Sequence, residues 1–226
     1  MKTPGQYVVG VTGEIGVGKS YVCEKFVQIG KERGILVNNI DFDQIVHRMY
    51  DGRLKEPLYE DVRKKIVEAF GKNVVFQDGM INRKVLGEIV FSDQKEMEKL
   101  NRVVHEPMMV ELRKELRGKK GLILINSALF AELGMNSISN NNTILVVANK
   151  EIQERRLKDR EFDKDQIHRR LESQYNADIK RKTIEDIISR DKKGQLWIVD
   201  NSDDSNENEI TSLFDKIVRY MNAFKF

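Results

Sequence analysis

Cysteine and proline are both scarce in this chain, which has 1 Cys and 3 Pro among 226 residues. The single cysteine, Cys23, cannot form an internal disulfide, which excludes the disulfide framework of small secreted domains and favours a reducing compartment. We expect Cys23 to be a small buried residue. Few Pro and only 15 Gly exclude collagen-like and disordered chains, while 40% hydrophobic residues suffice for a core. The length fits one α/β domain, or a core domain that carries a small insertion.

Long hydrophobic runs and a strong charge excess are lacking as well. No apolar run approaches the about 18 residues of a membrane-spanning helix, and the N-terminal MKTPGQYVVGVTGE is too interrupted by Gly for a signal peptide. We therefore expect a soluble, cytoplasmic protein with no membrane partner. Lys and Arg number 39 against 36 Asp and Glu, a net charge of +3. This balance is far from that of a dedicated nucleic-acid binder, so no nucleic-acid partner is expected.

Short apolar runs alternate with stretches of helical spacing along most of the chain. The predicted strands are residues 7–12, 35–40, 122–125, 143–148 and 196–199. The predicted helices are residues 19–32, 56–70, 94–116, 164–189 and 207–224. Strands that are apolar on both faces are typical of a parallel sheet covered by helices. The pattern therefore predicts an α/β fold with a five-stranded parallel sheet flanked by helices.

One interval interrupts this alternation. The roughly 80 residues between the second and third predicted strands have helical spacing and almost no strand signal. They predict a helical insertion in the sheet domain. Within the insertion, Asp78-Gly79 lies between two short apolar runs, a pattern that fits either a small hairpin or an ordinary loop.

The segment GEIGVGKS at residues 13–20 matches the phosphate-binding pattern G-x-x-x-x-G-K-[ST] between a predicted strand and a predicted helix. Such a loop offers backbone N–H donors and the positive end of a helix dipole to phosphate. We expect Lys19 to bridge the β- and γ-phosphates of ATP and the Ser20 hydroxyl to bind Mg²⁺. Glu14 is expected to face solvent, because a carboxylate repels triphosphate. The residues expected at the nucleotide are Gly13, Glu14, Ile15, Gly16, Val17, Gly18, Lys19, Ser20 and Tyr21.

Two other classes of nucleotide-binding protein fit less well. Guanine-specific GTPases usually carry N-K-x-D, but the nearest fragment, residues 149–152, reads NKEI and lacks the guanine-reading Asp. A translocating ATPase would usually have an Asp and then a catalytic Glu at the end of a strand, whereas residues 122–125 lead into Asn126. These differences favour a small-molecule kinase.

Two acids, Asp41 and Asp43, follow the second predicted strand. A P-loop kinase needs a carboxylate there to orient or deprotonate the acceptor hydroxyl. On an extended segment, residues two apart point the same way, so both acids could face the phosphate. Alternatively, one of them caps a helix that starts near Gln44.

Three ordered motifs resemble segments of the dephospho-CoA kinase family, namely GVTGEIGVGKS at 10–20, IDFD at 40–43 and FG…DGMINRKVLGEIVFSD at 70–93. The resemblance continues at VVHEP around His105, ALFAE at 128–132, the spacing of Gln153, Arg156 and Arg160, RLESQ at 170–174 and VDN at 199–201. The glycine-rich motif occurs in many kinases, whereas the other two are more particular. Together the motifs cover most of the chain.

The resemblance implies a P-loop nucleotide kinase fold and the final step of coenzyme A synthesis. In that step ATP, with Mg²⁺, phosphorylates the 3′-hydroxyl of the dephospho-CoA ribose. By family position, Asp43 is the base, and Asp41 assists at Mg²⁺-bound water or at the acceptor hydroxyl. The resemblance also assigns Arg83 and His105 to the substrate, Asn201 to the adenine region, and Arg156 and Arg160 to a mobile lid.

The same resemblance implies three parts within a single kinase domain of residues 1–226. They are a nucleotide-binding core of 1–43, 119–150 and 194–226, a helical substrate-binding insertion of 44–118, and a lid with its following helix at 151–193. A monomer is compatible with the sequence. Residues 150–193 hold 14 Lys and Arg against 11 Asp and Glu, which equals the excess of the whole chain and suits closure over anionic ligands.

In the lid, Arg156 and Arg160 stand four residues apart, so a helix would present both on one face. Mobile arginines that close over the transferred phosphoryl group would stabilise its charge and exclude water. The neighbouring acids also fit the alternative of a solvated helix with surface ion pairs.

Two alternatives to a dephospho-CoA kinase remain at this point. A nucleoside or nucleoside monophosphate kinase would share the phosphate loop, the acid and the lid. A non-catalytic nucleotide-binding regulatory module would explain why Glu14, Glu106 and Ala128 replace residues common in the family. Retention of Lys19 and both acids favours an active kinase.

Overall fold

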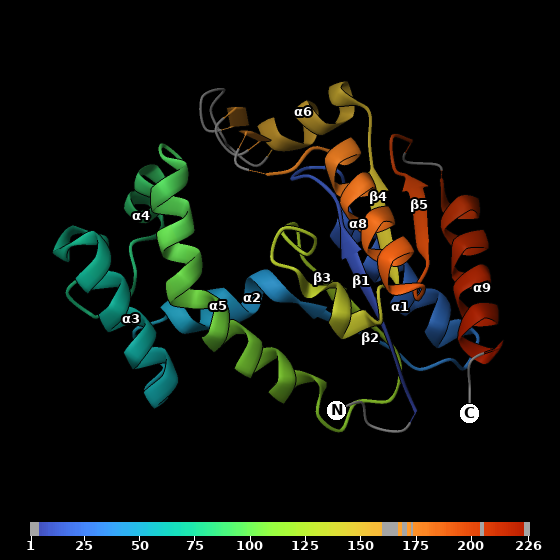
Figure 1. Cartoon of the computed structure of the whole chain (residues 1–226), viewed down its shortest axis with the longest axis horizontal. Coiled ribbons are helices and arrows are strands. Elements are labelled where there is room, and N and C mark those ends of the chain that lie inside the picture. The colour runs from blue at the N-terminus through green and yellow to red at the C-terminus, as the bar shows by residue number, and fades with distance from the viewer. Residues whose placement is uncertain (1–4, 160–166, 169–170, 173, 204–205, 224–226) are drawn as a thin grey trace. The chain divides into compact units, whose positions relative to one another are not determined.

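The computed structural model describes residues 5–159, 167–168, 171–172, 174–203 and 206–223. These residues belong to two compact units, which Figure 1 shows with their elements labelled. The first unit is Met1–Asp41 with Gly118–Phe226, and the second is Phe42–Arg117. No helix among the described residues has both the length and the apolar character needed to cross a membrane.

The first unit is built on a five-stranded parallel sheet. Its strands are β1 (Gln6–Thr12), β2 (Val37–Asp41), β3 (Gly121–Asn126), β4 (Thr143–Val147) and β5 (Leu196–Asp200), in the order β2-β3-β1-β4-β5. The central strands are buried along most of their length, which explains their continuous apolar runs. The predicted parallel sheet flanked by helices is therefore confirmed.

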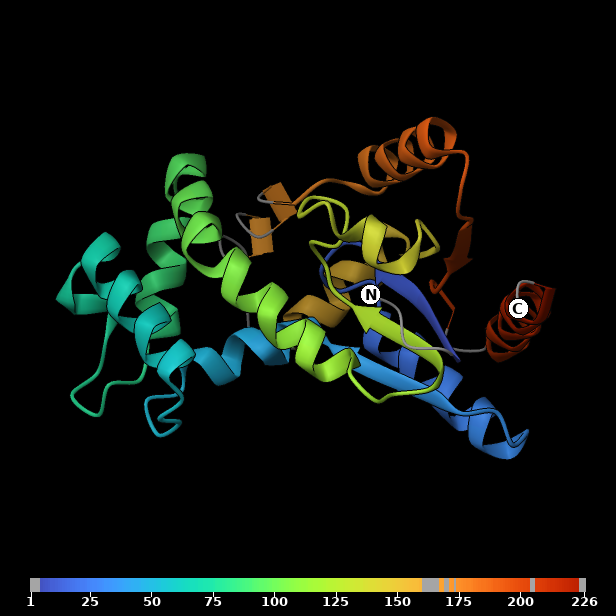
Figure 2. The same ribbon diagram turned by 60° about the horizontal axis from the view of Figure 1, so that its bottom comes forward.

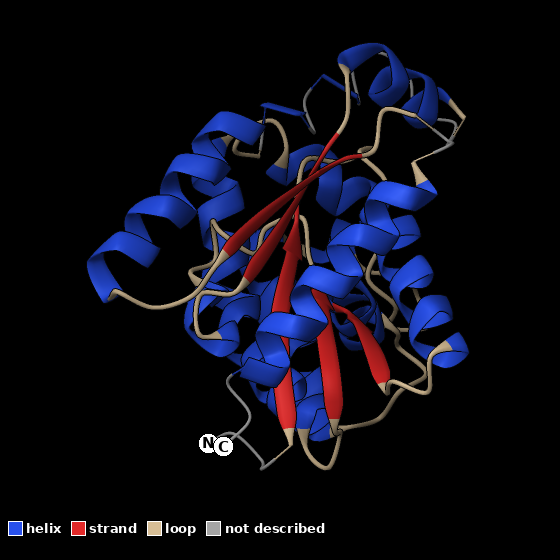
Figure 3. Ribbon diagram, turned by 90° about the vertical axis from the view of Figure 1, so that its right-hand side faces the viewer, coloured by secondary structure: helices blue, strands red, loops and turns tan. Residues whose placement is uncertain are grey.

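Helices cover both faces of this sheet, as Figures 2 and 3 show. The helices of the unit are α1 (Lys19–Glu32), α6 (Lys150–Lys158), α8 (Ala177–Asp191) and α9 (Glu207–Ala223), with a 3-10 turn at Met135–Ser139. On one face α1 packs against α9, where the rings of Phe26 and Phe214 meet edge to face with centroids 5.3 Å apart. Cys23 is buried in the same core, as expected.

The predicted single helix over residues 164–189 is wrong at residues 174–176, which are not helical. The helix α8 begins only at Ala177, because Asn176 caps it: the Asn176 side chain accepts a hydrogen bond of 2.9 Å from the Ile179 N–H. Asn is a strong N-cap residue because its short side chain reaches the free N–H groups of the first turn. Residues 164–166, 169–170 and 173 of the predicted helix lie outside the described residues.

The second unit is helical, as the sequence predicts for this interval. It contains α2 (Phe42–Tyr50), α3 (Pro57–Phe70), a 3-10 turn at Lys72–Val74, α4 (Arg83–Val90) and α5 (Gln94–Leu116). The core of this unit includes Ile45, Met49, Tyr59, Val62, Ile66, Leu86, Val104, Met108 and Leu112. At the Asp78-Gly79 turn, Val75 and Ile81 form an isolated antiparallel bridge, so the pairing of a minimal hairpin is present.

Candidate active site

The phosphate loop connects β1 to α1 at residues 13–18, and its glycines are required by close contacts. Gly13 has a φ of +147°, and a Cβ there would collide with the Val146 carbonyl oxygen. Gly18 caps α1 with a φ of +91°, and a Cβ there would collide with the Asn201 side-chain amide. Both backbone conformations and both contacts disfavour any larger residue. The sequence pattern therefore folds as a tight loop at the helix N-terminus.

Lys19 and Ser20 lie at the start of α1. The Lys19 Nζ donates hydrogen bonds to the carbonyl oxygens of Gly13 and Glu14, at 3.1 and 3.0 Å, so the ammonium lies across its own loop. The Ser20 hydroxyl is exposed and accepts a hydrogen bond of 3.3 Å from the Asn126 Nδ2. Tyr21 is half-buried, with the Lys25 ammonium 5.6 Å from its ring centroid.

Polar residues form a row at the carboxyl end of the sheet. Asp41 ends β2 and is the register partner of Asn126, which ends β3. Asn126 in turn contacts Ser20, so Asp41, Asn126 and Ser20 follow one another along this edge. In the sequence, Asn126 has no assigned site role and serves only as evidence against a translocating ATPase. Its position as the polar residue that ends a buried parallel strand is the signal that could have identified it.

The expectation that Asp41 and Asp43 share an extended segment is wrong. The strand ends at Asp41, the helix α2 begins at Phe42, and Asp43 lies in the first turn of that helix. The two-residue alternation of a strand therefore does not apply to this pair. The chain also changes units at this point, since Phe42 is the first residue of the second unit.

Arg156 and Asn201 hold the loop from the side of α6 and β5. The Asn201 side chain is fully buried and donates a hydrogen bond of 2.8 Å to the Val17 carbonyl. The Arg156 Nη1 donates to the same carbonyl at 3.3 Å and to the Asn201 carbonyl at 2.9 Å. Arg156 thus brings a positive charge to the base of the loop. Arg160, expected on the same helical face, lies outside the described residues.

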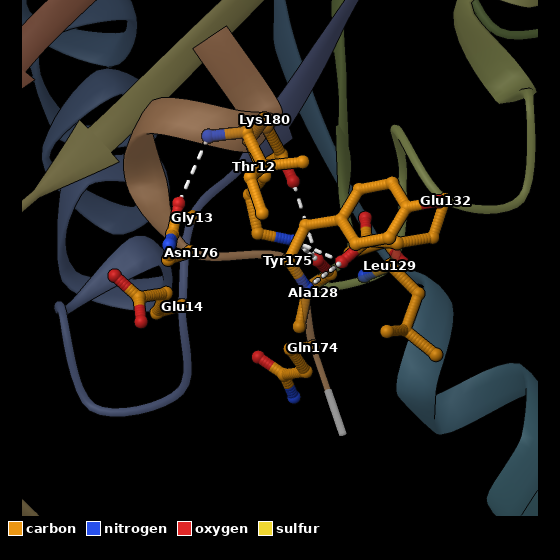
Figure 4. A network of polar contacts seen from close by, with 12 residues as sticks. Thr12, Gly13, Glu14, Ala128, Leu129, Glu132, Gln174, Tyr175, Asn176 and Lys180 are labelled. Carbon is orange, nitrogen blue, oxygen red and sulfur yellow. Dashed lines mark hydrogen bonds and ion pairs between the residues drawn. The ribbon is translucent and has the colours of Figure 1, made fainter. Parts of the chain in front are cut away.

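A buried ion pair lies close to the loop, as Figure 4 shows. Lys180 in α8 is fully buried, and its ammonium pairs with Glu132 and donates to the Ala128 carbonyl at 2.7 Å. Burial lowers the pKa of Lys180, and the carboxylates of Glu132 and Glu14 oppose this shift. Glu14 is half-buried rather than fully exposed to solvent as expected. The positive charge of Lys180 therefore acts on the Glu14 carboxylate as well as on Glu132.

The residues assigned to the substrate lie in the second unit. Arg83 is exposed at the first position of α4, whose N-terminus is capped by the Asn82 side chain. Burial raises the pKa of Tyr50, and the Arg83 guanidinium opposes this shift. His105 is half-buried in the middle of α5.

Comparison with known proteins decides the family. Residues 7–195 match the family model described as dephospho-CoA kinase. The chain belongs to the dephospho-CoA kinase family. A dephospho-CoA kinase of Dehalococcoides mccartyi is 35% identical over 173 residues, which cover 74% of this chain and 80% of that protein. Another from Bacillus licheniformis is 32% identical over 194 residues, which cover 84% of this chain and 89% of that protein.

A solved structure supports the fold of this family member. The crystal structure of TT1252 from Thermus thermophilus matches with a TM-score of 0.71 at 23% identity, covering 97% of this chain and 98% of that chain.

Proposed function

We propose that this kinase transfers the γ-phosphoryl group of ATP to the 3′-hydroxyl of dephospho-CoA, which gives coenzyme A and ADP. The observation that carries the proposal is the phosphate loop together with Asp41, Asn126 and Ser20, which follow one another at the carboxyl end of the sheet. The chain that holds them matches the family over residues 7–195. The proposal places the protein at the last step of coenzyme A synthesis, in the cytoplasm.

On the nucleotide side, residues 13–21 bind the phosphates of ATP. Phosphoryl transfer develops charge on the equatorial phosphate oxygens, so catalysis depends on positive groups held in position. Lys19 supplies one positive group. Its ammonium already lies across the loop, where it donates to two carbonyl oxygens, and the phosphate oxygens of ATP can replace these as acceptors. Arg156 supplies a second charge at the base of the loop, and Arg160 and Asn201 are assigned to the nucleotide by family position.

Three residues at the carboxyl end of the sheet, Ser20, Asp41 and Asn126, have side chains that fit a magnesium ion. Mg²⁺ prefers oxygen ligands and is usually held by one or two protein groups together with substrate phosphates and waters. Ser20 would hold the ion, and Asp41 and Asn126 would hold its waters. When bound, Mg²⁺ neutralises charge on the β- and γ-phosphates.

On the acceptor side, we assign Asp43 as the base that takes the proton of the 3′-hydroxyl, with Asp41 assisting. Arg83 and His105 bind the acceptor, and an exposed guanidinium such as that of Arg83 suits its anionic pyrophosphate. The three-part division into a nucleotide-binding core, a substrate-binding insertion and a lid belongs to the same proposal.

A coupled assay of ADP release tests this function. The protein is supplied with ATP, Mg²⁺ and either dephospho-CoA, adenosine or AMP, and the product is identified by mass spectrometry. Dephospho-CoA should stimulate ADP release and become coenzyme A, whereas Lys19→Met should abolish the stimulation. Preference for adenosine or AMP would indicate a nucleoside or nucleoside monophosphate kinase. ATP binding without turnover on any acceptor would indicate a regulatory module.

A further inference from the structure

Two glutamines bind the backbone of one residue, Ile15, in the middle of the phosphate loop. The Ile15 N–H donates a hydrogen bond of 3.1 Å to the Gln174 Oε1. The Ile15 carbonyl accepts one of 2.7 Å from the Gln153 Nε2. Gln153 lies in α6 and is 6% exposed, while Gln174 precedes α8. The loop is therefore hydrogen-bonded by α6 and by the segment before α8, both of which are far from it in the sequence.

The chemistry of the two contacts is complementary. A backbone N–H needs an acceptor and a carbonyl needs a donor, so Gln174 must present its oxygen and Gln153 its NH₂ group. The loop also packs on α6, because a Cβ added at Gly16 would lie 2.9 Å from the Leu157 Cγ and 3.1 Å from the Gln153 Cγ. Contact along α6 and hydrogen bonds at Ile15 together determine where the loop lies.

The residues that follow Gln174 are anchored in turn. The Tyr175 N–H donates to the Glu132 Oε1 at 3.1 Å, and Glu132 pairs with the buried Lys180. Figure 4 shows Gln174, Tyr175 and Lys180 along one segment beside Ala128 and Glu132. The Ala128 carbonyl also accepts a hydrogen bond of 3.3 Å from Thr12, the residue directly before the loop. Gln174 therefore belongs to a network that returns to the start of the loop.

We infer that Gln153 and Gln174 are positioning residues for ATP, and the inference rests on the proposed kinase function. A loop rich in glycine loses much conformational entropy when it is ordered around a ligand. By holding the peptide groups on both sides of Ile15, the two glutamines keep the loop in its phosphate-binding shape before ATP arrives. Such preorganisation strengthens binding without any direct contact between these side chains and the nucleotide.

Substitution by Met, which preserves size and removes the hydrogen bond, gives the first test. Gln153→Met and Gln174→Met should each raise the Kd for Mg-ATP about fivefold, the loss expected for one hydrogen bond. The KM for dephospho-CoA should stay close to wild type, and the midpoint of thermal unfolding should fall by no more than about 2–4 °C, the cost of one hydrogen bond in a chain of this size. Gln28→Met, on the exposed face of α1, is the matched control and should change none of these values.

Charged variants separate the hydrogen bonds from simple electrostatics. Lys can donate at position 153 but cannot accept at 174, and Glu can accept at 174 but cannot donate at 153. Gln153→Lys should therefore bind Mg-ATP more tightly than Gln174→Lys, and Gln174→Glu more tightly than Gln153→Glu. Within each comparison the added charge is the same, so the order reports on the contact to Ile15.

Three results would overturn the inference. One is a Kd for Mg-ATP within twofold of wild type in both Met variants. Another is a loss of ATP affinity that appears only in variants whose midpoint of thermal unfolding falls by more than the cost of one hydrogen bond. The third is the failure of either predicted order, with Gln174→Lys binding Mg-ATP as tightly as Gln153→Lys or Gln153→Glu as tightly as Gln174→Glu. Because the Kd is measured by calorimetry without an acceptor, failure of dephospho-CoA as substrate would not obscure any of these outcomes.

Discussion

At the scale of single residues, the acids on either side of Phe42 have different local structures. Asp41 ends a strand and faces Asn126 in register, whereas Asp43 lies in the first turn of α2. The row that links Asp41 to Ser20 supports a role beside the metal, and the family position of Asp43 supports a role as base. Substitution of each acid can therefore separate metal binding from proton transfer.

Asp43→Asn should lower kcat by about 10²–10⁴-fold, the contribution of a positioned base, and leave the KM for ATP nearly unchanged. Asp41→Asn should instead raise the Mg²⁺ concentration needed for half-maximal rate. Steady-state kinetics over a range of Mg²⁺ concentrations measure both effects, with circular dichroism as a check of folding. Near-normal turnover of Asp43→Asn would transfer the role of base to Asp41 or remove it.

At the scale of elements, the helix α8 is attached to the segment after β3 by the pair of Lys180 and Glu132. Both partners are largely removed from solvent, since the Lys180 side chain is 0% and the Glu132 side chain 13% exposed. A buried charge without its partner is strongly unfavourable. The attachment therefore depends on the presence of both charges.

Lys180→Met should reduce the free energy of unfolding by about 3–5 kcal/mol, because it leaves the Glu132 carboxylate, largely removed from solvent, without its positive partner. The double variant Lys180→Met/Glu132→Gln should recover part of this loss. Urea denaturation measures both. Arg181→Met provides the control, since its exposed pair with Glu185 is worth only about 0.3–0.5 kcal/mol. If Lys180→Met cost no more than this control, the pair would not anchor α8.

At the scale of the whole molecule, the chain forms two units that each have a core of their own. In the second unit, the buried Arg63 of α3 binds the backbone of the segment that connects α2 to α3. Its guanidinium donates hydrogen bonds to the carbonyl oxygens of Met49, Asp51 and Leu54, at 3.1, 2.8 and 2.9 Å. One side chain therefore binds three carbonyl groups along the connection between α2 and α3.

Arg63→Met should lower the free energy of unfolding by about 1–3 kcal/mol, because carbonyl groups lose their donor. The Kd for Mg-ATP should stay within twofold of wild type, since the lost contacts all lie in the 42–117 unit. Chemical denaturation and calorimetry measure the two quantities. Lys64→Met, at an exposed neighbour, should leave stability nearly unchanged. A large loss of ATP affinity in Arg63→Met would contradict the assignment of this contact to the second unit alone.

The amino-acid sequence by itself determined the features that depend on local spacing. Apolar runs predict the five strands, because parallel strands are covered on both faces. The pattern at residues 13–20 predicts the phosphate loop, because its glycines adopt conformations that other residues disfavour. The break before α8 was missed, since the periodic apolar residues of 164–189 masked the cap at Asn176.

Only the tertiary structure decided which polar groups meet at the loop. Asn126 contacts Ser20 across 106 positions, and Gln174 contacts Ile15 across 159. The position of Asn126 beside Asp41 follows from the strand order β2-β3-β1-β4-β5 and the strand register, and that of Gln174 from the path of the chain before α8; no local pattern specifies either. The sequence therefore identified the type of chemistry, and the folded sheet selected the side chains that position it.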